Sequence, residues 1–508
     1  MFKNCRSHQE FKNFIKEELT NYYANPFFYS TVTKRVDIIF KVFNTDFTSV
    51  RQLLEFSYNP RGETPWNPTC LFRSYWLLCQ YGDTGSISKW VHKLKTEPFW
   101  AIISGFTPND VPGVGTFYDF EDRLCDFDKG QRKELTKKMH KPLSKPRKNL
   151  KKNQKKPPKH KNIVERLVNR ILRDEDKKQP KRKDDLLQKI FKESFVLPSA
   201  KKGLLGDTAN LAISGDGMIF KTGGSPYGTK DCDCHNTKGI FNCNCPRRFS
   251  DPTANWGWDS YREKYVYGYS NYTFTAAESP NDLPIFSTLT QAARHDSVSH
   301  TYSLYNMKML YPEFNFKADI LDSAHDNYAT YELLNHWNIQ PFIDLNKRSK
   351  GNFKYDPPID VTDEGVPICK AGFKMVNWGP DPKLKRHKWR CPHVCLKSCE
   401  CPIFNCSDSD YGRTIYTKAK WDLRIFTPIP RDSKKWKKTM KKRTSSERRN
   451  SKVKIQYNLE QDNVRSKSRW LIRTVMRDGA LHADAWLKHS NIDLNQWLDS
   501  WFNYNIAA

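Results

Sequence analysis

Three acidic residues of the sequence are placed where they could share metal ions. Asp216 follows the apolar run LAISG, Asp322 follows KADIL, and Glu447 lies in the basic segment MKKRTSSERRNSKVK. Ligands of an open α/β sheet usually bind at the carboxyl ends of its strands, so the two aspartates could converge with an acid from a packed helix. Such an oxygen cluster suits two Mg²⁺ or Mn²⁺ ions, which can activate a water or a 3′-hydroxyl for attack on a phosphodiester.

The basic segment at 440–454 contains seven Lys and Arg residues and a single acid. At about 100° per residue, a helix would place Met440, Arg443, Glu447 and Lys454 within about 60° of one another. We expect the cations around Glu447 to hold a nucleic acid backbone over the metals, and the residues expected to bind DNA are Arg443, Lys454, Arg448, Lys441 and Lys442. The alternative is a solvated charge run in which the acid makes local ion pairs.

Each aspartate also has a structural explanation. Asp216 precedes a glycine, which is typical of a turn, and Asp322 with Ser323 could cap the helix that follows. Nearby acids that compete for the same role are Asp207, Asp319 and Asp326.

Two other pairs of residues could carry chemistry. His295 and Asp296 could suggest acid–base catalysis, but phosphoryl transfer with two metals does not need them, so we expect a structural role. Trp256 and Trp258 could stack on an unpaired base, although packing in the core is the better expectation.

Ten of the fourteen cysteines fall in two clusters, which favours thiolates held by metal in a reducing compartment over a disulfide scaffold. In the first cluster, two C-x-C pairs with His235 beside them could surround one tetrahedral Zn²⁺ with the residues Cys232, Cys234, Cys243 and Cys245. The second cluster offers Cys391, Cys395, Cys399 and Cys401, with Cys369, His393 and Cys406 as further ligands. The second cluster could form one zinc site or two, and cysteines of the two clusters could also share a site. The alternative is that the cysteines are reduced thiols that bind no metal and only pack against their neighbours.

The charge balance favours a polyanionic partner. The 508 residues include 85 Lys and Arg against 56 Asp and Glu, a formal net charge of +29. Nucleic acid and an anionic membrane surface are the usual candidates for such a chain. The sequence has neither a signal-like apolar start nor a membrane-spanning apolar run, so we expect a cytoplasmic protein.

Changes in composition divide the chain into five parts. Residues 1–128 have helical spacing, and 129–195 combine a basic tether, expected to be disordered, with a helical linker. Residues 196–345 alternate strands and helices, 346–410 form a Cys-rich insertion, and 411–508 add the strand-like runs GRTIYT and LRIFTPI, the Glu447 helix and C-terminal helices. The sequence thus predicts an α/β core, a mixed sheet with flanking helices, between an all-α N-terminal domain and a Cys-rich insertion.

These motifs resemble the insertion-sequence DDE transposases, whose catalytic core is ribonuclease-H-like. One branch of that family has the signature Y, two residues, R, three residues, E, six residues, K. Arg443, Glu447 and Lys454 match three of its positions with the correct spacing, and Met440 stands at the Tyr position. AISGDGMIF and ADILDSAHDNYATYELL are similar to the family's first and second acid regions, and the resemblance covers most of the chain outside the basic tether.

The resemblance implies an activity, partners and a location. Asp216, Asp322 and Glu447 would bind two metal ions, while Arg443 and Lys454 would contact phosphates near the cleaved end. The enzyme would cut the ends of a transposon in double-stranded DNA and join the 3′-hydroxyls to target DNA, as a homodimer associated with a prokaryotic nucleoid. The N-terminal helices would help to recognise the element's ends. The alternative is a non-enzymatic, zinc-containing DNA-binding protein derived from a transposase, in which the acids are structural.

Overall fold

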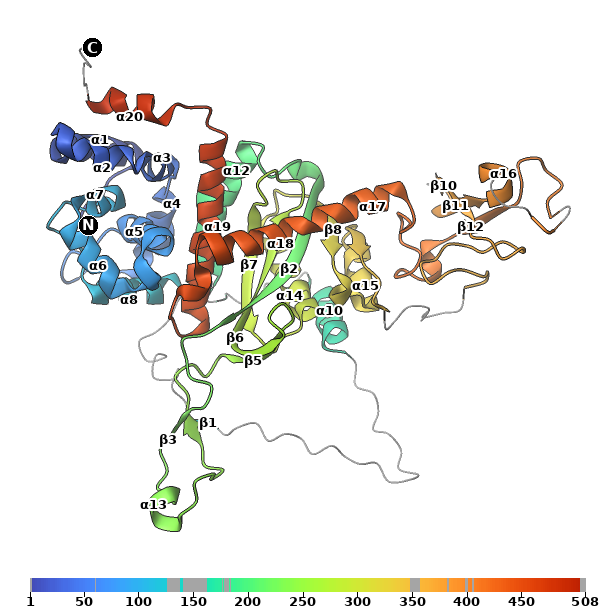
Figure 1. Ribbon diagram of the computed structural model, residues 1–508, viewed down its shortest axis with the longest axis horizontal. Coiled ribbons are helices and arrows are strands. Elements are labelled where there is room, and N and C mark those ends of the chain that lie inside the picture. The colour runs from blue at the N-terminus through green and yellow to red at the C-terminus, as the bar shows by residue number, and fades with distance from the viewer. Residues whose placement is uncertain are drawn as a thin grey trace.

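The structure is a computed structural model (Figure 1). It describes residues 2–59, 61–125, 138–139, 162–175, 177, 182, 184–347, 357–381, 383–397, 401–403 and 406–502. Apart from 138–139 and 162, the basic tether at 131–162 lies outside the described residues.

The N-terminal part is helical, as its apolar spacing predicts. Ser7 and Glu10 form a capping box at the start of the first helix, which satisfies backbone donors that the helix leaves unpaired. The helices are α1 (His8–Tyr22), α2 (Pro26–Thr33), α3 (Val36–Asn44), α4 (Thr48–Leu54), α5 (Pro68–Tyr81), α6 (Ile87–Thr96), α7 (Pro98–Ser104) and α8 (Val114–Leu124). Twelve consecutive residues of α5, from Pro68 to Cys79, are buried, so this helix is the centre around which the others pack.

The central sheet combines antiparallel and parallel strands. Its strands are β2 (Leu211–Lys221), β5 (Asn255–Asp259), β6 (Lys264–Ala276), β7 (Pro284–Gln291), β8 (Phe316–Leu321) and β9 (Gln340–Ile343). β6 pairs antiparallel with β2, β5 and β7, whereas β8 pairs parallel with both β2 and β9. The expected mixed sheet with flanking helices is therefore present.

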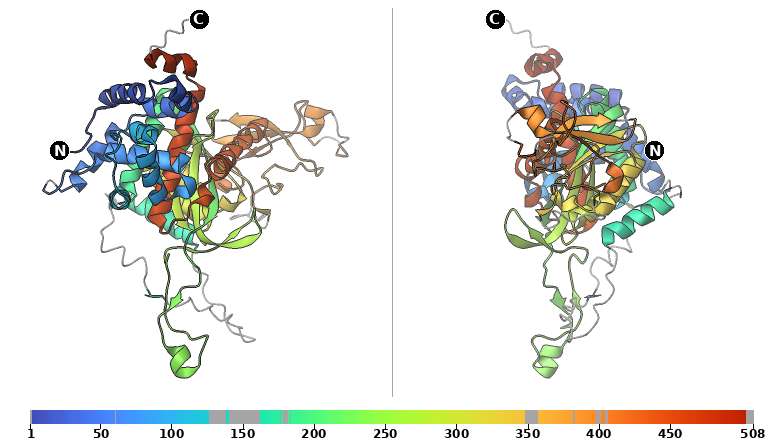
Figure 2. Two further views of the ribbon diagram at one scale, coloured as in Figure 1. Left: turned by 60° about the vertical axis from the view of Figure 1, so that its left-hand side comes forward. Right: turned by 90° about the vertical axis from the view of Figure 1, so that its right-hand side faces the viewer.

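Helices cover both faces of this sheet (Figures 1 and 2). On one face lies α14 (Asp296–Leu310), and α10 (Ile163–Asp174) packs on it and on α15 (Tyr328–His336) through a small apolar cluster. The other face carries α17 (Lys434–Met440) and α18 (Thr444–Ser451), which are joined by a 3-10 turn at Lys441–Arg443. A π-helical turn, Lys452–Gln456, follows α18 and leads towards α19 (Lys467–Lys488) and α20 (Leu494–Phe502).

One hydrophobic core joins the N-terminal helices to the sheet. α19 is buried along most of its length and packs against both α5 and β7. Shorter helices, α11 (Asp185–Phe191) and α12 (Leu197–Lys201), flank a π-helical turn whose Phe195 packs on Trp76 of α5 and on Trp486 of α19. The expected all-α N-terminal part is present, but it shares its core with the sheet.

Two extensions project from this body (Figure 1). The first, which we call the Cys arm, spans residues 225–249 and contains β3 (Thr229–Lys230), α13 (Cys234–Lys238) and β4 (Arg247–Arg248). Lys138–Met139, named β1, pairs antiparallel with β4, so the basic tether contacts the Cys arm at this point. Every residue between Thr229 and Arg248 is described by the structure and none is buried.

The second extension, which we call the Cys-rich lobe, holds β10 (Val376–Asp381), β11 (Arg386–Arg390), α16 (Pro392–Leu396) and β12 (Thr414–Thr417). A separate small core of Val366, Met375 and Trp389 stabilises it. The strand expected at GRTIYT forms as β12, but it pairs with β11 of the lobe and not with the central sheet. The prediction of a strand at LRIFTPI is wrong, because this segment is an irregular stretch held by its own capping aspartate, Asp422.

Candidate active site at the edge of strands β2 and β8

The pairing of β2 with β8 places Asp216 and Asp322 level with each other. Ser214 pairs with Ile320 in this parallel ladder, so two residues further on the same register brings Asp216 beside Asp322. Neighbouring strands lie about 4.8 Å apart, and residues two apart point to the same face. The ordered pairing with β8 stops here, although β2 itself runs on to Lys221. Asp216 is therefore inside a strand and not after its end, which corrects the sequence prediction.

Helix α18 is fixed over these strands by hydroxyl contacts. The Ser214 hydroxyl lies 3.0 Å from that of Ser446, and the Thr275 hydroxyl lies 3.0 Å from that of Ser445. One turn further along the helix, the Asn450 side-chain amide donates to the Asp216 carboxylate at 2.9 Å. The prediction that a helix from the basic segment packs beside the first aspartate is confirmed.

Glu447 lies one turn before Asn450 on the same flank of α18, at an axial rise of about 4.5 Å. Its carboxylate pairs with the Arg443 guanidinium at 2.8 Å, which is the local ion pair that the alternative interpretation predicts. Arg443 also acts on the second aspartate. Burial opposes ionisation of Asp322, but the His325 hydrogen bond and charge, together with Arg443, hold the pKa of this carboxyl below its ordinary value. The charge of Arg443 thus acts on both Glu447 and Asp322.

Asp216 is the most strongly perturbed of the three acids. Burial, the Asp296 carboxylate and the Asp322 carboxylate raise the pKa of Asp216 to about 7. Desolvation disfavours the charged form of an acid, and nearby like charges disfavour it further. Near neutral pH this carboxyl therefore exchanges a proton readily, and a bound cation would favour its charged form.

Asp296 is a fourth acid of this site that the sequence reasoning did not assign to it. The residue begins α14, while His295 caps the same helix and so has the expected structural role. Asp296 lies so close to β2 that any side chain at position 217 would collide with its carboxylate. The space for Asp296 exists because residue 217 is a glycine. Burial, followed by the charge of Asp322, raises its pKa. The two glycines that flank Asp216 leave room for close neighbours, but the sequence does not show that Asp296 is one of them.

A buried hydrogen-bond network holds the Asp322 carboxylate in place. The His325 Nδ1 lies 2.7 Å from the Asp322 carboxylate, and its Nε2 lies 3.0 Å from the Tyr272 hydroxyl. Burial favours neutral His325, but Asp322 outweighs it and raises the His325 pKa. Asp322 also accepts a backbone hydrogen bond from Ala324 at 3.1 Å, so it does cap the following turn.

The competing aspartates have structural partners. Asp319 binds the buried His300 at 2.7 Å, and Asp326 forms a buried ion pair with Arg424 at 2.7 Å. Asp207 caps a 3-10 turn through the Ala209 amide at 2.9 Å. These contacts give Asp319, Asp326 and Asp207 structural roles, so none of the three needs a role in the candidate site.

Most of the cations expected to bind DNA already have acidic partners. Lys442 pairs with Glu278, Arg448 pairs with Asp282 at 2.7 Å, and Lys454 lies 3.5 Å from Glu460 in the π-helical turn. Lys441 is exposed. Met440, Arg443, Glu447 and Lys454 are expected on one face of a single helix. This helix is interrupted, because a 3-10 turn precedes α18 and a π-helical turn follows it.

The first cysteine cluster is gathered as predicted. The sulfur atoms of Cys232, Cys234, Cys243 and Cys245 all lie within 4.8 Å of one another. Hydrogen bonds among the four thiols shift their pKa values in opposite directions: Cys232 lowers the pKa of Cys243 to about 7, while Cys234 raises the pKa of Cys245 to about 12. Four such sulfurs are a donor set suited to a soft or borderline divalent metal.

The second cysteine cluster is not gathered in the same way. Among the described residues, the four cysteines of the arm are the one group of three or more potential ligands at metal-binding spacing. Cys391, Cys395 and Cys401 are described and form no such group, while Cys399 lies outside the described residues. The three acids Asp216, Asp322 and Glu447 are also described and do not form such a group.

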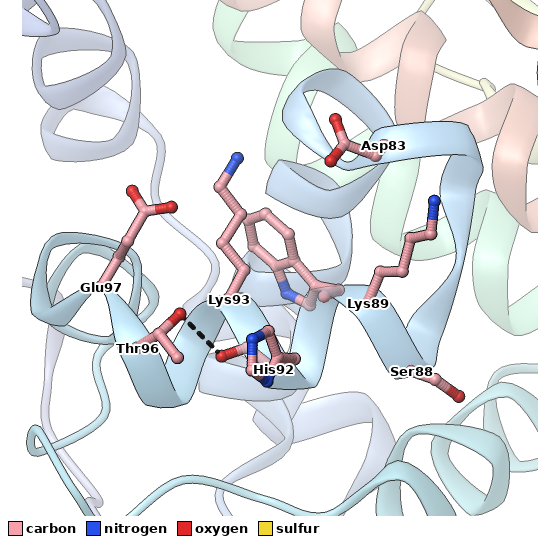
Figure 3. A pocket seen from close by; sticks show the side chains of 8 residues that line it. Asp83, Ser88, Lys89, His92, Lys93, Thr96 and Glu97 are labelled. Carbon is pink, nitrogen blue, oxygen red and sulfur yellow. Dashed lines mark hydrogen bonds between the residues drawn. The ribbon is translucent and has the colours of Figure 1, made fainter.

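A hollow of about 540 Å³ lies on the N-terminal helices, away from these acids (Figure 3). Lys89, Lys93 and His92 of α6 line it together with the acids Asp83 and Glu97. Figure 3 shows the two lysines extending from one side of the helix. This mixture of charges offers a surface for phosphates but no arrangement of reacting groups comparable to that at β2 and β8.

No protein-family model, curated protein or solved structure matches the chain. Within the described part of the chain, none of the helices combines the length and apolar character needed to cross a membrane.

Proposed function

We propose that the chain is a DDE transposase of an insertion sequence, with a ribonuclease-H-like core that cuts transposon ends and joins the 3′-hydroxyls to target DNA. The observation that carries this proposal is the placement of Asp216 on β2 level with Asp322, which directly follows the adjacent strand β8, with the Glu447 helix packed against Asp216. The mixed sheet with helices on both faces is compatible with such a core.

Asp216, Asp322 and Glu447 would hold two Mg²⁺ or Mn²⁺ ions. Their donor chemistry fits these hard cations, and the raised pKa of Asp216 beside two further carboxylates marks a place where a cation would relieve repulsion. When bound, the metals would supply Lewis-acid activation of a phosphodiester and of the attacking oxygen. Glu447 would need to exchange its ion pair with Arg443 for the metal, which frees the guanidinium to contact a phosphate.

Double-stranded DNA would be the partner, both as transposon ends and as target. The net charge of +29 supports binding to a polyanion through release of counterions. Two ends would be joined by a homodimer, and the protein would act at the nucleoid in the prokaryotic cytoplasm.

The Cys arm would hold a structural Zn²⁺. Its four sulfurs fit a closed tetrahedral site, and the stretch from Thr229 to Arg248, which has no buried residue, needs a cross-link to keep one conformation. Bound zinc would therefore be expected to order the arm and not to take part in strand cleavage.

A second candidate function is a non-enzymatic, zinc-containing DNA-binding protein. The Glu447–Arg443 ion pair and the spacing of the three acids favour it, because the only metal-spaced group of the described residues is the cysteine cluster.

Strand cleavage by the Glu447→Gln variant separates these functions. Labelled DNA that carries the ends of the protein's own element is incubated with Mg²⁺ or Mn²⁺, and Glu364→Gln, at an exposed acid of the Cys-rich lobe, is the matched control. Metal-dependent nicking by wild type and control, with loss in Glu447→Gln, is expected. Equal products from all three proteins would contradict the role of Glu447, and binding without nicking by wild type would favour the second function.

A further inference from the structure

Another cavity, of about 450 Å³, lies where the N-terminal helices meet the start of α19 (Figure 1). Its volume is in the range of pockets that hold small ligands. The beginning of α6, one side of α8 and the segment that leads into α19 line it. The charged residues of the lining are four cations and one acid, namely Lys89, Arg465, Arg469, Arg473 and Glu121. The cavity therefore has an excess of positive charge.

Arg473 of α19 is the buried cation of this cavity. Its side chain is 1% exposed, and its Nε atom has no hydrogen-bond partner among the described residues. Its Nη1 atom donates to the Cys79 sulfur at 3.8 Å, and its guanidinium carbon lies 4.7 Å from the centre of the Tyr75 ring. No described carboxylate forms an ion pair with Arg473, and the neighbouring Asp462 binds Arg477 instead at 2.8 Å. A buried charge without an ion-pair partner is costly, and an anion in the cavity would relieve this cost.

The other cations of the cavity lie nearer the surface. Arg469 is partly buried and binds the Glu121 carboxylate at 2.9 Å, which neutralises the acid of the lining. Glu121 also accepts a hydrogen bond from the Tyr75 hydroxyl. Lys89 and Arg465 are exposed, and neither forms an ion pair with an acid in the part of the chain that the structure describes. Two cations at the rim thus remain available to a ligand.

Two helices begin beside this cavity. The Ser466 side chain makes no capping hydrogen bond at the start of α19, a helix of 22 residues. Ser86 caps α6 by accepting from the Lys89 amide at 3.4 Å, which is a long hydrogen bond. The positive end of a helix dipole favours a negative group. The two helix ends therefore add to the attraction that the cations exert on an anion.

A phosphate group with three terminal oxygens fits this arrangement. Arg473 lies in the interior while Lys89 and Arg465 lie at the rim, so the ligand must present acceptors in several directions. Guanidinium groups bind phosphate oxygens through paired N–H donors. A phosphodiester within a duplex carries a nucleotide on each side, so it can reach the rim but not the buried guanidinium. A free phosphate, or the terminal phosphate of a small ester, can reach both.

From these observations we propose that the cavity binds inorganic phosphate or the terminal phosphate of a small phosphate ester, with Arg473 beneath the anion and Lys89 and Arg465 at its edge. The bound anion would connect α6 to α19, because its ligands come from both helices and from the segment between α18 and α19. It would thereby stabilise the packing of the N-terminal helices on α19. This inference goes beyond the proposed function, since it needs neither DNA nor strand cleavage.

Calorimetric titration of the full chain tests the proposal. The probes are inorganic phosphate, methyl phosphate and dimethyl phosphate, in buffer without DNA or divalent metal and with chloride added to keep the ionic strength constant. We expect saturable binding of one phosphate per chain and a similar affinity for methyl phosphate. Dimethyl phosphate lacks the third terminal oxygen and should bind at least about 10-fold more weakly, the loss expected for one hydrogen bond between charged groups.

Two substitutions at the rim test the assigned residues. Arg465→Gln and Lys89→Gln should each weaken the binding of inorganic phosphate about 10-fold, because each removes one charge-assisted hydrogen bond. The matched controls are Lys467→Gln and Lys95→Gln, which remove an exposed positive charge near the tested residue but outside the lining. They should change the affinity by less than about twofold, because salt screens charges at a distance. All four positions are exposed, so the variants should keep the fold.

Three outcomes would overturn the proposal. The first is the absence of saturable phosphate binding by wild type. The second is an equal loss of affinity in the tested and control variants, which would show a general effect of surface charge. The third is binding of dimethyl phosphate as tight as that of inorganic phosphate, which would assign the cavity to a backbone phosphodiester. None of them bears on Glu447-dependent nicking, so the proposed function is tested separately.

Discussion

Replacing Asp216 by Asn should stabilise the protein, and more so at high pH. Burial and two neighbouring carboxylates raise the pKa of Asp216 from its ordinary value of 3.8 to about 7. The folded state therefore keeps a proton that the unfolded state releases, so wild-type stability falls as pH rises between these two values. The asparagine amide is neutral throughout, and the Asn450 side chain can still donate to its oxygen.

The expected gain follows from this pKa difference. At about 1.4 kcal/mol for each pKa unit, the full difference corresponds to about 4 kcal/mol at pH 8. At pH 5 the folded carboxyl is still protonated, and only about 1 to 2 kcal/mol of the gain is expected.

Urea unfolding at the two pH values, without added divalent metal, measures both gains. Glu17→Gln, at an exposed acid of α1, is the control and should change stability little at either pH. A gain for Asp216→Asn that is equal at pH 5 and pH 8, or a loss at pH 8, would refute the electrostatic reasoning. Saturating Mg²⁺ should narrow the difference in free energy of unfolding between wild type and Asp216→Asn, since a ligand stabilises the folded state that binds it.

Two further changes test the metal of the arm and the packing beneath α18. Cys243→Ser should lower the zinc content, measured by atomic emission, by one ion per chain. The control Cys5→Ser, at an exposed cysteine, should leave the zinc content unchanged. An unchanged zinc content in Cys243→Ser would exclude the four-sulfur site. Arg449→Met should cost about 3 to 5 kcal/mol in urea unfolding, because it leaves the Asp478 carboxylate buried without its ion-pair partner. The double change with Asp478→Leu should recover much of this loss, and failure to do so would show that the arginine acts by more than charge.

The apolar runs of the core predicted its strands well, because short alternating or continuous apolar segments leave few other solutions. ADIL lies in strand β8, which begins two residues earlier, and the run at 265–277 lies in strand β6, which begins and ends one residue earlier. The run LAISG predicts a strand that ends before Asp216, since Gly and Asp usually mark a turn. In the fold Gly215 and Gly217 remain in the strand, and their missing side chains leave room for Tyr272 and Asp296. The local sequence around the glycines does not predict which residues approach them.

The candidate site was only partly predictable for a related reason. Asp216 and Asp322 could be chosen by their position after apolar runs, but the level placement of their strands comes from the parallel register of β2 and β8. Asp296 comes from a helix on the opposite face, so its proximity depends on tertiary packing alone. Trp256 is 43% exposed and Trp258 is 51% exposed, so the prediction that they pack in the core is wrong. Their exposed position was missed because composition favours tryptophan in cores.

Under the proposed function, the core shared by the N-terminal helices, α19 and the sheet would fix a length of DNA. These elements form one packed unit, so the helices cannot move along a bound duplex independently of Asp216. If α1 to α8 contact an element's end, the number of base pairs between the contacted sequence and the bond to be cut is set by the fold. Inserting half a helical turn of DNA between them would turn the scissile phosphate to the far side of the duplex, away from the carboxylates.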